Sequence, residues 1–367
     1  MSEYNIQMNK YNALNTEYDQ LYPQPMKHAN THAKDGSDPI TSADIGAYSK
    51  IETDSLLSSK PNPNLLDNWY FGNPINQRGQ TSYTGEAYGI DRWTLGLWNH
   101  VSPSLLISDG YITLSNNTAE GTSSSCYIRQ YIDNPEQFAG QTVTFSVLLG
   151  AVAKGSGKLV IAISVNGSAG SATEIKAENA NSIASITLTL PSEVTSLSVY
   201  IGQSANNAGK GTFSIQLKAA KLELGSTQTI AHQENGVWVL NEIPDYGEQL
   251  RRCQRYFYRF PQIGDIYTDF GIGLVQSATN FYSVIKFPVS MRNAPSLVAY
   301  GSFRLLSANF NTAISVTSIE YDTGIDSSTS DSIKIRATVS GGLTVGTPMY
   351  LQAAKDPSAH IDFIADL

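Results

Sequence analysis

Four short segments decide the fold: LVIAISV at 159–165, SITLTL at 185–190, LSVYI at 197–201 and FSIQL at 213–217. In each segment a large apolar residue alternates with a smaller or more polar one, so one face of the extended chain is apolar. Turn-forming Gly, Asn and Ser separate the segments, and no long amphipathic helix lies between them. This pattern predicts an antiparallel β-sandwich, with a domain over residues 64–226.

The alternation returns in the last third of the chain, at 285–291, 333–339 and 361–367. It predicts a second β domain over residues 253–367. Residues 227–252 read as an irregular linker that contains a short helix near its end. Within the sandwich, the apolar positions change parity after Leu217, which predicts a bulge or bend in that strand.

Residues 1–63 have a different character. Apolar and aromatic side chains recur at helical spacing at Tyr4, Tyr11, Leu14, Tyr18 and Leu21. This predicts a short helix that is too short to fold alone. It either packs against a partner or its own copies, or it is a frayed tail, and a proline-containing linker follows it.

Composition excludes several functions. Of the 367 residues, 15% are charged, and 24 basic against 32 acidic side chains give a net charge of −8. This balance argues against nucleic-acid binding and against docking on anionic lipid. No apolar run reaches the roughly 18 residues of a membrane span, and the N-terminus does not resemble a signal peptide. We therefore expect synthesis in a cytoplasm, with any extracellular role reached by another route. The 20 tyrosines suit neutral, hydroxyl-rich ligands.

No catalytic motif is evident. The sequence contains no GxSxG, HExxH or Walker pattern, and a pair of catalytic carboxylates cannot be established from it. Cys126 and Cys253 lie far apart and are expected to be buried thiols rather than a disulfide. His28 and His32 are four residues apart and could share a metal, but no further ligand lies at suitable spacing. We expect no enzymatic activity, no cofactor and no metal.

The best candidate site lies in the run CYIRQYI at 126–132. In a strand, Tyr127, Arg129 and Tyr131 share the face opposite to Cys126 and Ile128. A polar, aromatic outer face suits a glycan, because Tyr offers both a flat apolar surface and a hydroxyl group. The alternative is a contact between subunits or domains, where Tyr and Arg are also enriched.

Two further groups carry open alternatives. One group is Asp91, Arg92 and Trp93, which either bind a sugar or form a structural ion pair beside a core tryptophan. Trp98 has the same two alternatives, sugar binding or a structural role. In the C-terminal domain, Tyr256 and Tyr258 are expected on one strand face, as part of a second receptor surface or of the core.

Three groups of motifs follow one another along the chain, with HANTHA at 28–33 in the first, YGIDRW at 88–93 in the second and FPVSMR at 287–292 in the third. Together they resemble motifs of tail-fibre receptor-binding proteins of bacteriophages and prophages. The first resembles an N-terminal element of such fibres: HANTHA at 28–33, GSDPIT at 36–41 and DIGA at 44–47. The second resembles jelly-roll modules of carbohydrate-binding type: NLLDNWYF at 64–71, NQRG at 76–79, YGIDRW at 88–93 and KLELG at 221–225. The third resembles the start of their C-terminal domain: YGEQL at 246–250, CQRY at 253–256, FPVSMR at 287–292 and AP at 294–295.

This resemblance implies a homotrimeric fibre on a virion, with residues 1–63 attached to a phage tail or baseplate protein. It also implies recognition of a bacterial surface glycan by a jelly roll, and a C-terminal β domain that forms the distal head. A depolymerase tailspike and a purely structural fibre or baseplate spacer are the alternatives.

Overall fold

The computed structural model describes residues 3–21, 62–85, 87–100, 102–321 and 328–366. It contains two compact units, residues 1–60 and 61–367. In the first unit, helix α1 spans Glu3–Leu21, and the described side chains of its first four turns are exposed. This confirms the predicted N-terminal helix. His28 and His32 lie outside the described residues.

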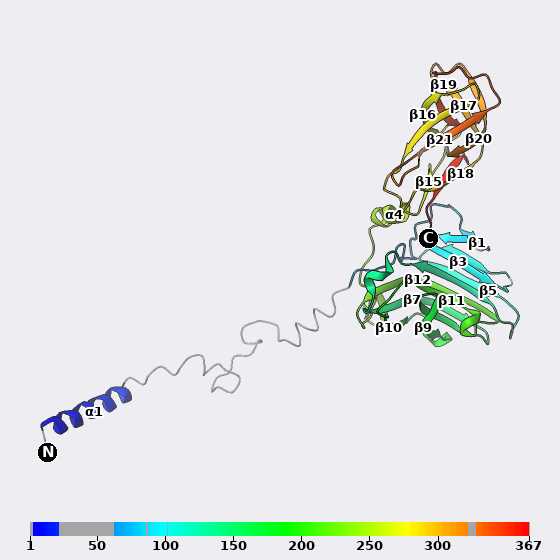
Figure 1. Cartoon of the computed structure of the whole chain (residues 1–367). Coiled ribbons are helices and arrows are strands. Elements are labelled where there is room, and N and C mark those ends of the chain that lie inside the picture. Colours follow the sequence, from blue (N-terminus) through cyan, green and yellow to red (C-terminus); the bar gives the residue numbers. More distant parts are fainter. Residues whose placement is uncertain (1–2, 22–61, 86, 101, 322–327, 367) are drawn as a thin grey trace. The chain divides into compact units, whose positions relative to one another are not determined.

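The second unit begins with a sandwich of two six-stranded antiparallel sheets (Figure 1). The strands of the first sheet, in spatial order, are β1 (Ser82–Tyr83), β4 (Ser104–Ser108), β5 (Tyr111–Asn117), β12 (Thr212–Leu224), β7 (Thr142–Lys154) and β10 (Ile183–Thr189). Those of the second sheet are β2 (Ala87–Ile90), β3 (Trp93–Trp98), β6 (Ser125–Tyr131), β11 (Leu197–Gln203), β8 (Leu159–Val165) and β9 (Ser168–Ile175). The chain switches repeatedly between the sheets, and the short 3-10 helices η1 (Pro135–Phe138), η2 (Ala177–Asn179) and η3 (Ala205–Asn207) lie in the connections. The predicted antiparallel sandwich is confirmed.

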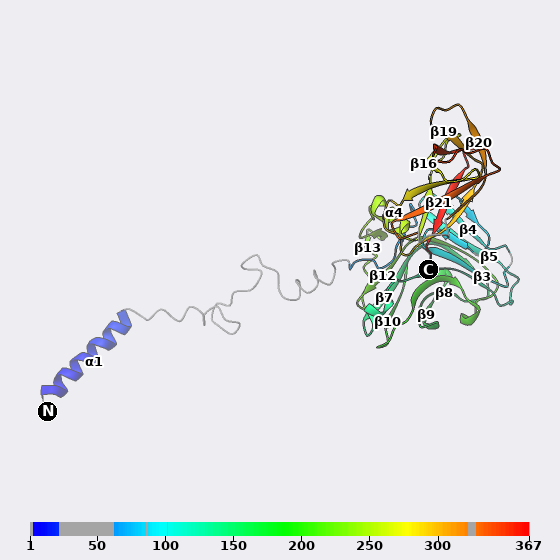
Figure 2. The same cartoon turned by 45° about the horizontal axis from the view of Figure 1, so that its top comes forward.

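The alternation read from the sequence fills the space between the sheets. Leu159, Ile161 and Ile163 from β8 and Phe213 and Ile215 from β12 are all buried in one core. The strand register shifts on both sides of Leu217, as the change of parity predicts. Figure 2 shows β12, β7 and β10 in one layer, and β3, β8 and β9 in the other.

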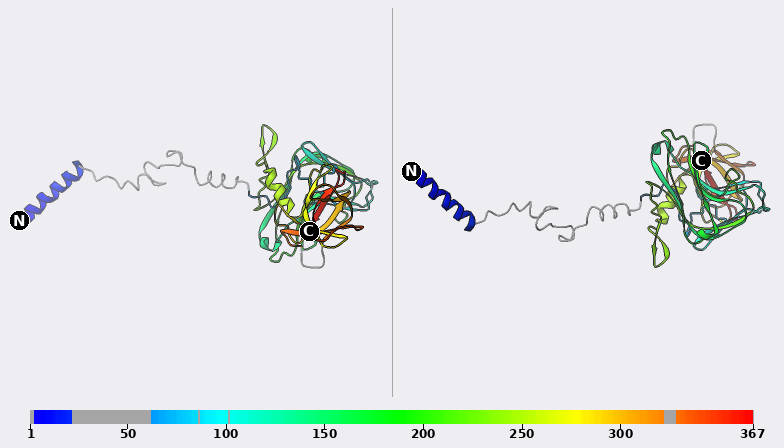
Figure 3. Two further views of the ribbon diagram at one scale, coloured as in Figure 1. Left: turned by 90° about the horizontal axis from the view of Figure 1, so that it is seen from above. Right: turned by 90° about the horizontal axis from the view of Figure 1, so that it is seen from below.

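The segment after the sandwich contains more regular structure than expected. It forms the hairpin β13 (Ala231–Glu234) and β14 (Val237–Leu240), seen in yellow-green projecting from the body in Figure 3, and then helix α4 (Tyr246–Gln254). The hairpin was not predicted. The short helix was, and it begins where the Asp245 carboxylate accepts a hydrogen bond from the backbone N–H of Glu248 at 2.7 Å.

The C-terminal β domain combines a small sheet with a closed barrel. The sheet contains β15 (Phe257–Phe260), β23 (His360–Ile364) and β18 (Ser296–Tyr300). The barrel runs in the order β16 (Asp269–Val275), β17 (Asn280–Lys286), β21 (Ser332–Val339), β20 (Ala313–Tyr321), β19 (Phe303–Ser307) and β22 (Pro348–Ala353). The strand expected to continue to residue 291 ends at Lys286, because Pro288 lacks the N–H that a continuing ladder needs.

Both cysteines are buried free thiols, as predicted. Burial raises the pKa of Cys126 to about 12, and its thiol donates to the carbonyl oxygen of Ser115 at 3.5 Å, so it stays protonated and unreactive. Among the described residues, no helix is both long and apolar enough to span a membrane.

Candidate functional site

Strand β6 presents a polar aromatic face to the outside of the second sheet. Cys126, Ile128 and Gln130 are buried, whereas Tyr127 and Arg129 are half-buried and Tyr131 is 37% exposed. The two sets alternate along an extended strand, so they lie on opposite faces of the sheet. The structure therefore places Tyr127, Arg129 and Tyr131 together on the outer face.

A fourth residue from a neighbouring strand joins this face. Tyr200 on β11 lies directly opposite Arg129 in the register. Its ring centroid lies 5.3 Å from that of Tyr127, and both rings belong to an apolar cluster separate from the sandwich core. Tyr200 was not singled out from the sequence. Its parity in LSVYI, opposite to Leu197 and Val199, is the signal that could have found it.

Arg129 is the centre of these four residues, which we call the tyrosine–arginine cluster (Tyr127, Arg129, Tyr131 and Tyr200). Its guanidinium carbon lies 4.8 Å from the ring centroid of Tyr127, 5.6 Å from that of Tyr131 and 5.4 Å from that of Tyr200. Its Nη1 donates a hydrogen bond of 3.1 Å to the Tyr131 hydroxyl. Its buried Nε has no hydrogen-bond partner within the described part of the chain. A buried donor without a partner is costly, so this N–H opposes the stabilisation that the guanidinium gains from the three rings.

Two glycines make room for the Tyr127 ring. Gly96 on β3 and Gly202 on β11 are the cross-strand neighbours of Tyr127. A Cβ atom at Gly96 would lie 2.4 Å from the ring, and one at Gly202, where φ is +141°, would lie 2.4 Å from the Cys126 carbonyl oxygen. The ring therefore lies against bare backbone, and side chains at these two positions would displace it.

Trp98 extends the same face in the direction of Ser125. It follows Gly96 at the next outward position of β3, lies opposite Ser125 of β6, and is 56% exposed. Strand β6 has seven residues, which span roughly 20 Å at about 3.3 Å per residue. Exposed aromatic surface thus lies near both ends of an extended polar face.

The structure places Asp91, Arg92 and Trp93 in the interior and not on the outer face of the sheet. All three are buried, and the Trp93 indole N–H donates a 3.0 Å hydrogen bond to the carbonyl oxygen of Asn68. Arg92 Nε lies 3.0 Å from an Asp67 carboxylate oxygen. Trp93 thus lies in the core as the structural alternative expects, but Arg92 pairs with Asp67 and not with Asp91.

Asp91 is an unusual member of this buried group. Its carboxylate lies 3.0 Å from Arg78 Nη1 and also accepts a 2.7 Å hydrogen bond from the Gln77 side chain. Desolvation outweighs these contacts and raises the pKa of Asp91 to about 6. Arg78 also contacts Asp366 at 3.0 Å, so it joins the sandwich to the C-terminal domain.

Tyr256 and Tyr258 pack mainly in the interior, which matches the core alternative more closely than an exposed receptor surface. Tyr256 is buried, with the Arg92 guanidinium 3.4 Å above its ring centroid, and its hydroxyl donates to Asp133. Tyr258 stacks between Phe260 and Phe363, with centroid separations of 6.1 and 6.0 Å. Tyr256 precedes β15 and faces the sandwich, whereas Tyr258 packs on the barrel, so they do not form one exposed face.

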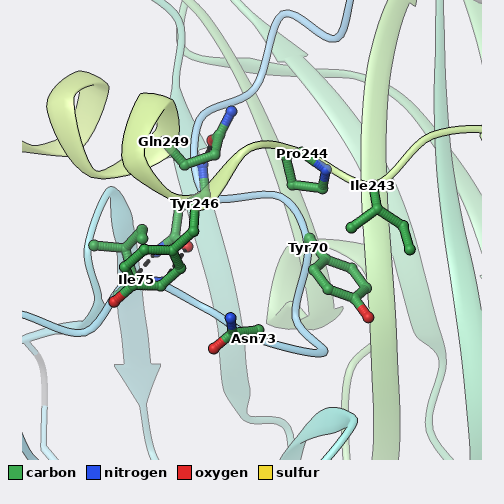
Figure 4. A pocket seen from close by; sticks show the side chains of 8 residues that line it. Tyr70, Asn73, Ile75, Ile243, Pro244, Tyr246 and Gln249 are labelled. Atoms are coloured by element: carbon green, nitrogen blue, oxygen red, sulfur yellow. Dashed lines mark hydrogen bonds between the residues drawn. The ribbon is translucent and has the colours of Figure 1, made fainter.

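A small cavity lies beside α4 (Figure 4). It has a volume of about 60 Å³ and is lined by Asn68, Tyr70, Asn73, Ile75, Ile243, Pro244, Tyr246 and Gln249. That volume holds about two water molecules but no sugar ring. Within the described ranges, no group of three or more His, Cys, Asp or Glu side chains is placed to hold a metal ion.

The fold and the cluster define an antiparallel β-sandwich with an aromatic outer face. No protein-family model matches the sequence, and no curated protein matches it. Among solved structures, the chain is similar to a family 22 carbohydrate-binding module of Clostridium thermocellum Xyn10B, with 15% identity over 40% of this chain and 96% of that chain and a TM-score of 0.23. It is also similar to the tandem family 22 modules of Paenibacillus barcinonensis Xyn10C, with 10% identity over 84% of this chain and 99% of that chain and a TM-score of 0.25. A variant of a family 29 module shows 14% identity over 39% of this chain and 91% of that chain, with a TM-score of 0.19. At these values the similarity does not bear on what this chain binds.

Proposed function

We propose that this chain is a non-catalytic receptor-binding protein that recognises a bacterial surface glycan through the outer face of the second sheet. The observation that carries the proposal is the tyrosine–arginine cluster, which is held outside a sandwich whose core is filled by other side chains. The half-buried Tyr127 ring and the exposed Tyr131 ring offer apolar surface to a sugar face. Their hydroxyl groups match sugar hydroxyls as hydrogen-bonding partners.

The phage setting is supported by the sequence motifs and by α1. The motifs resemble those of tail-fibre proteins, and the helix carries exposed apolar side chains such as Tyr11 and Leu14. We propose a homotrimer on a virion tail fibre, with the N-terminal segment bound to a tail or baseplate protein. Three copies of a weak site would hold the particle by avidity.

Binding is tested with fluorescently labelled full-length protein on a glycan array and on candidate host cells. We expect Tyr127→Ala to reduce binding, whereas Tyr111→Ala, on a strand of the other sheet, leaves it unchanged. Absence of binding to any glycan or cell would refute the proposal in favour of a structural spacer. Release of reducing ends from a bound polysaccharide would instead indicate a depolymerase.

The assembly is tested separately by sedimentation equilibrium. We expect a trimer at micromolar concentration, and a clean monomer would contradict the proposed homotrimer.

A further inference from the structure

We propose that the glycan site continues past Tyr131 into an arginine-lined cleft beside α4, and that its ligand is an acidic polysaccharide. This inference rests on the proposed function and adds the ligand class and the extent of the site. It involves residues that the sequence does not connect with CYIRQYI.

The cleft is continuous with the end of β6. A pocket of about 400 Å³ is lined by Tyr131 itself and by the residues that follow it, Ile132, Asp133 and Asn134. A second pocket, of about 470 Å³, is lined by the same three following residues. The two pockets therefore share a wall, and the first of them begins at the cluster. Their volumes fall within the range of roughly 300 to 1,000 Å³ typical of small-molecule sites.

The cleft is positively charged in an acidic protein. Four guanidinium groups and two carboxylates line the two pockets: Arg92, Arg252, Arg255, Arg292, Asp67 and Asp133. Arginine thus exceeds aspartate by two charges here, although the whole chain has a net charge of −8. Such a local reversal of sign favours an anionic group on the ligand.

The ion pairs leave one guanidinium group free for a ligand. The Asp67 carboxylate lies 3.0 Å from Arg92 and 2.7 Å from Arg252, so two cations share one anion. Arg292 Nε lies 3.2 Å from Asp133. Arg255 is exposed and forms no ion pair with any described residue. A planar guanidinium in this position can bind a carboxylate through two parallel hydrogen bonds.

Polar uncharged groups complete the lining. Asn134 and Gln137 line the second pocket, next to apolar surface from Leu65 and Phe138. A sugar acid needs this combination, because its ring hydroxyls require amide partners while its carboxylate requires arginine. The overall negative charge of the chain disfavours a nucleic acid as the anionic polymer.

The test uses full-length protein on a glycan array that carries uronic-acid polysaccharides beside their carboxyl-reduced, neutral forms. We expect preferential binding to the acidic forms, and weaker binding as the salt concentration rises. Arg255→Gln is expected to weaken acidic binding about tenfold, which corresponds to the loss of one charge-assisted hydrogen bond. The matched control is Arg251→Gln, since Arg251 lies on α4, pairs with Glu248 and lines neither pocket.

The outcomes separate this inference from the proposed function. Equal or better binding to the neutral forms, still lost in Tyr127→Ala, would overturn the acidic ligand while leaving the glycan-binding face intact. If Arg255→Gln and Arg292→Gln both bind the acidic forms as the wild type does, the acidic ligand is likewise overturned and the glycan-binding face again stands. Absence of binding to every glycan would overturn both proposals. Circular dichroism of each variant establishes that it is folded before its binding is compared.

Discussion

The two tryptophans of β3 provide the sharpest test of which side chains are core and which belong to the surface. Trp93 is fully buried, its ring contacts Phe71 edge-to-face at a centroid distance of 5.3 Å, and its indole N–H donates to Asn68 at 3.0 Å. Trp98, on the same strand, is 56% exposed. We predict that Trp93→Phe destabilises the sandwich, whereas Trp98→Phe does not.

The magnitude follows from the contacts that are lost. Phenylalanine at Trp93 leaves the buried carbonyl oxygen of Asn68 without its donor, which costs about 1–3 kcal/mol. The smaller ring also leaves a cavity, which adds about 1–2 kcal/mol. A total of about 2–5 kcal/mol lowers the unfolding temperature by roughly 4–20 °C. The exposed Trp98 should contribute less than about 0.5 kcal/mol.

Differential scanning calorimetry of the full chain measures both variants, because it resolves the transition of the sandwich from that of other parts. An unfolding temperature for Trp93→Phe within 1 °C of wild type would refute the assigned hydrogen bond and packing. An equal fall in Trp98→Phe would show that the assigned exposure is wrong. In the glycan assay the order reverses: Trp98→Ala should weaken binding, and folded Trp93→Phe should bind as wild type does.

Three further predictions concern single contacts. In Gly96→Ala the new Cβ would lie 2.4 Å from the Tyr127 ring, so glycan binding should weaken in a titration; Gly85→Ala, where a Cβ meets nothing within 4 Å, is the control. Burial raises the pKa of Asp366 to about 6, so the charged form is disfavoured in the folded state and the wild-type free energy of unfolding falls as pH rises from about 4 to 6. The free energy of unfolding of Asp366→Asn does not fall in this way, because the variant lacks the titrating carboxyl. In urea unfolding, the free energy of unfolding of the variant relative to wild type should increase by at most about 3 kcal/mol between pH 4.5 and pH 7.5. Hydrogen bonds from Ser156 and Thr212 lower the pKa of Glu120 from 4.5 to about 2, so their stabilising effect is present above pH 4.5 and is lost as pH falls through 2. Glu120→Gln should be the less stable form at pH 7 and should converge with wild type near pH 2.

Each of these has a contrary result. Unchanged binding in Gly96→Ala would mean that the Tyr127 ring does not contact the ligand. A constant difference between Asp366→Asn and wild type across the two pH values would show that this carboxyl titrates normally. A Glu120→Gln variant as stable as wild type at pH 7 would show that the carboxylate is not needed by its loop.

Periodicity predicted the sandwich well because strand parity is a local property. In β8 and β12 the large apolar residues must share one face, and a two-residue repeat in the sequence is enough to show it. The bulge near Leu217 was visible for the same reason, as a change of parity. The β13–β14 hairpin was missed because its sequence alternates weakly, and Val237 and Val239 stay exposed.

Parity alone could not decide between the two tryptophans of β3. Trp93 and Trp98 are an odd number of residues apart, so in a strand they lie on opposite faces, and one must point outward. Which of them faces the core depends on residues from elsewhere in the chain, because Phe71 and Asn68, which contact Trp93, lie in the segment before β1. The sequence therefore shows that the two tryptophans lie on opposite faces, but it does not show which of them faces the core.

The tyrosine–arginine cluster and the cleft also differ in how far they could be predicted from the sequence. Tyr127, Arg129 and Tyr131 lie in one strand and were found together from the sequence. Tyr200 joins them only because β11 pairs with β6, a pairing between segments about 70 residues apart. The cleft residues come from six separate segments, so no local pattern could bring Arg255 and Asp133 together.

Several of the few charged residues of this chain form ion pairs at the boundary between its two β domains. Arg78 bridges Asp91 and Asp366, and Arg259 lies 2.8 Å from Asp362, so several of the few charges are consumed in buried pairs. Such pairs add little net stability, because desolvation offsets their attraction, but their directional hydrogen bonds favour one arrangement of the groups they join. The neighbouring cleft draws its walls from the same boundary. Three of its guanidinium groups, those of Arg92, Arg252 and Arg292, are held by Asp67 and Asp133 before any ligand arrives, which reduces the ordering cost of binding.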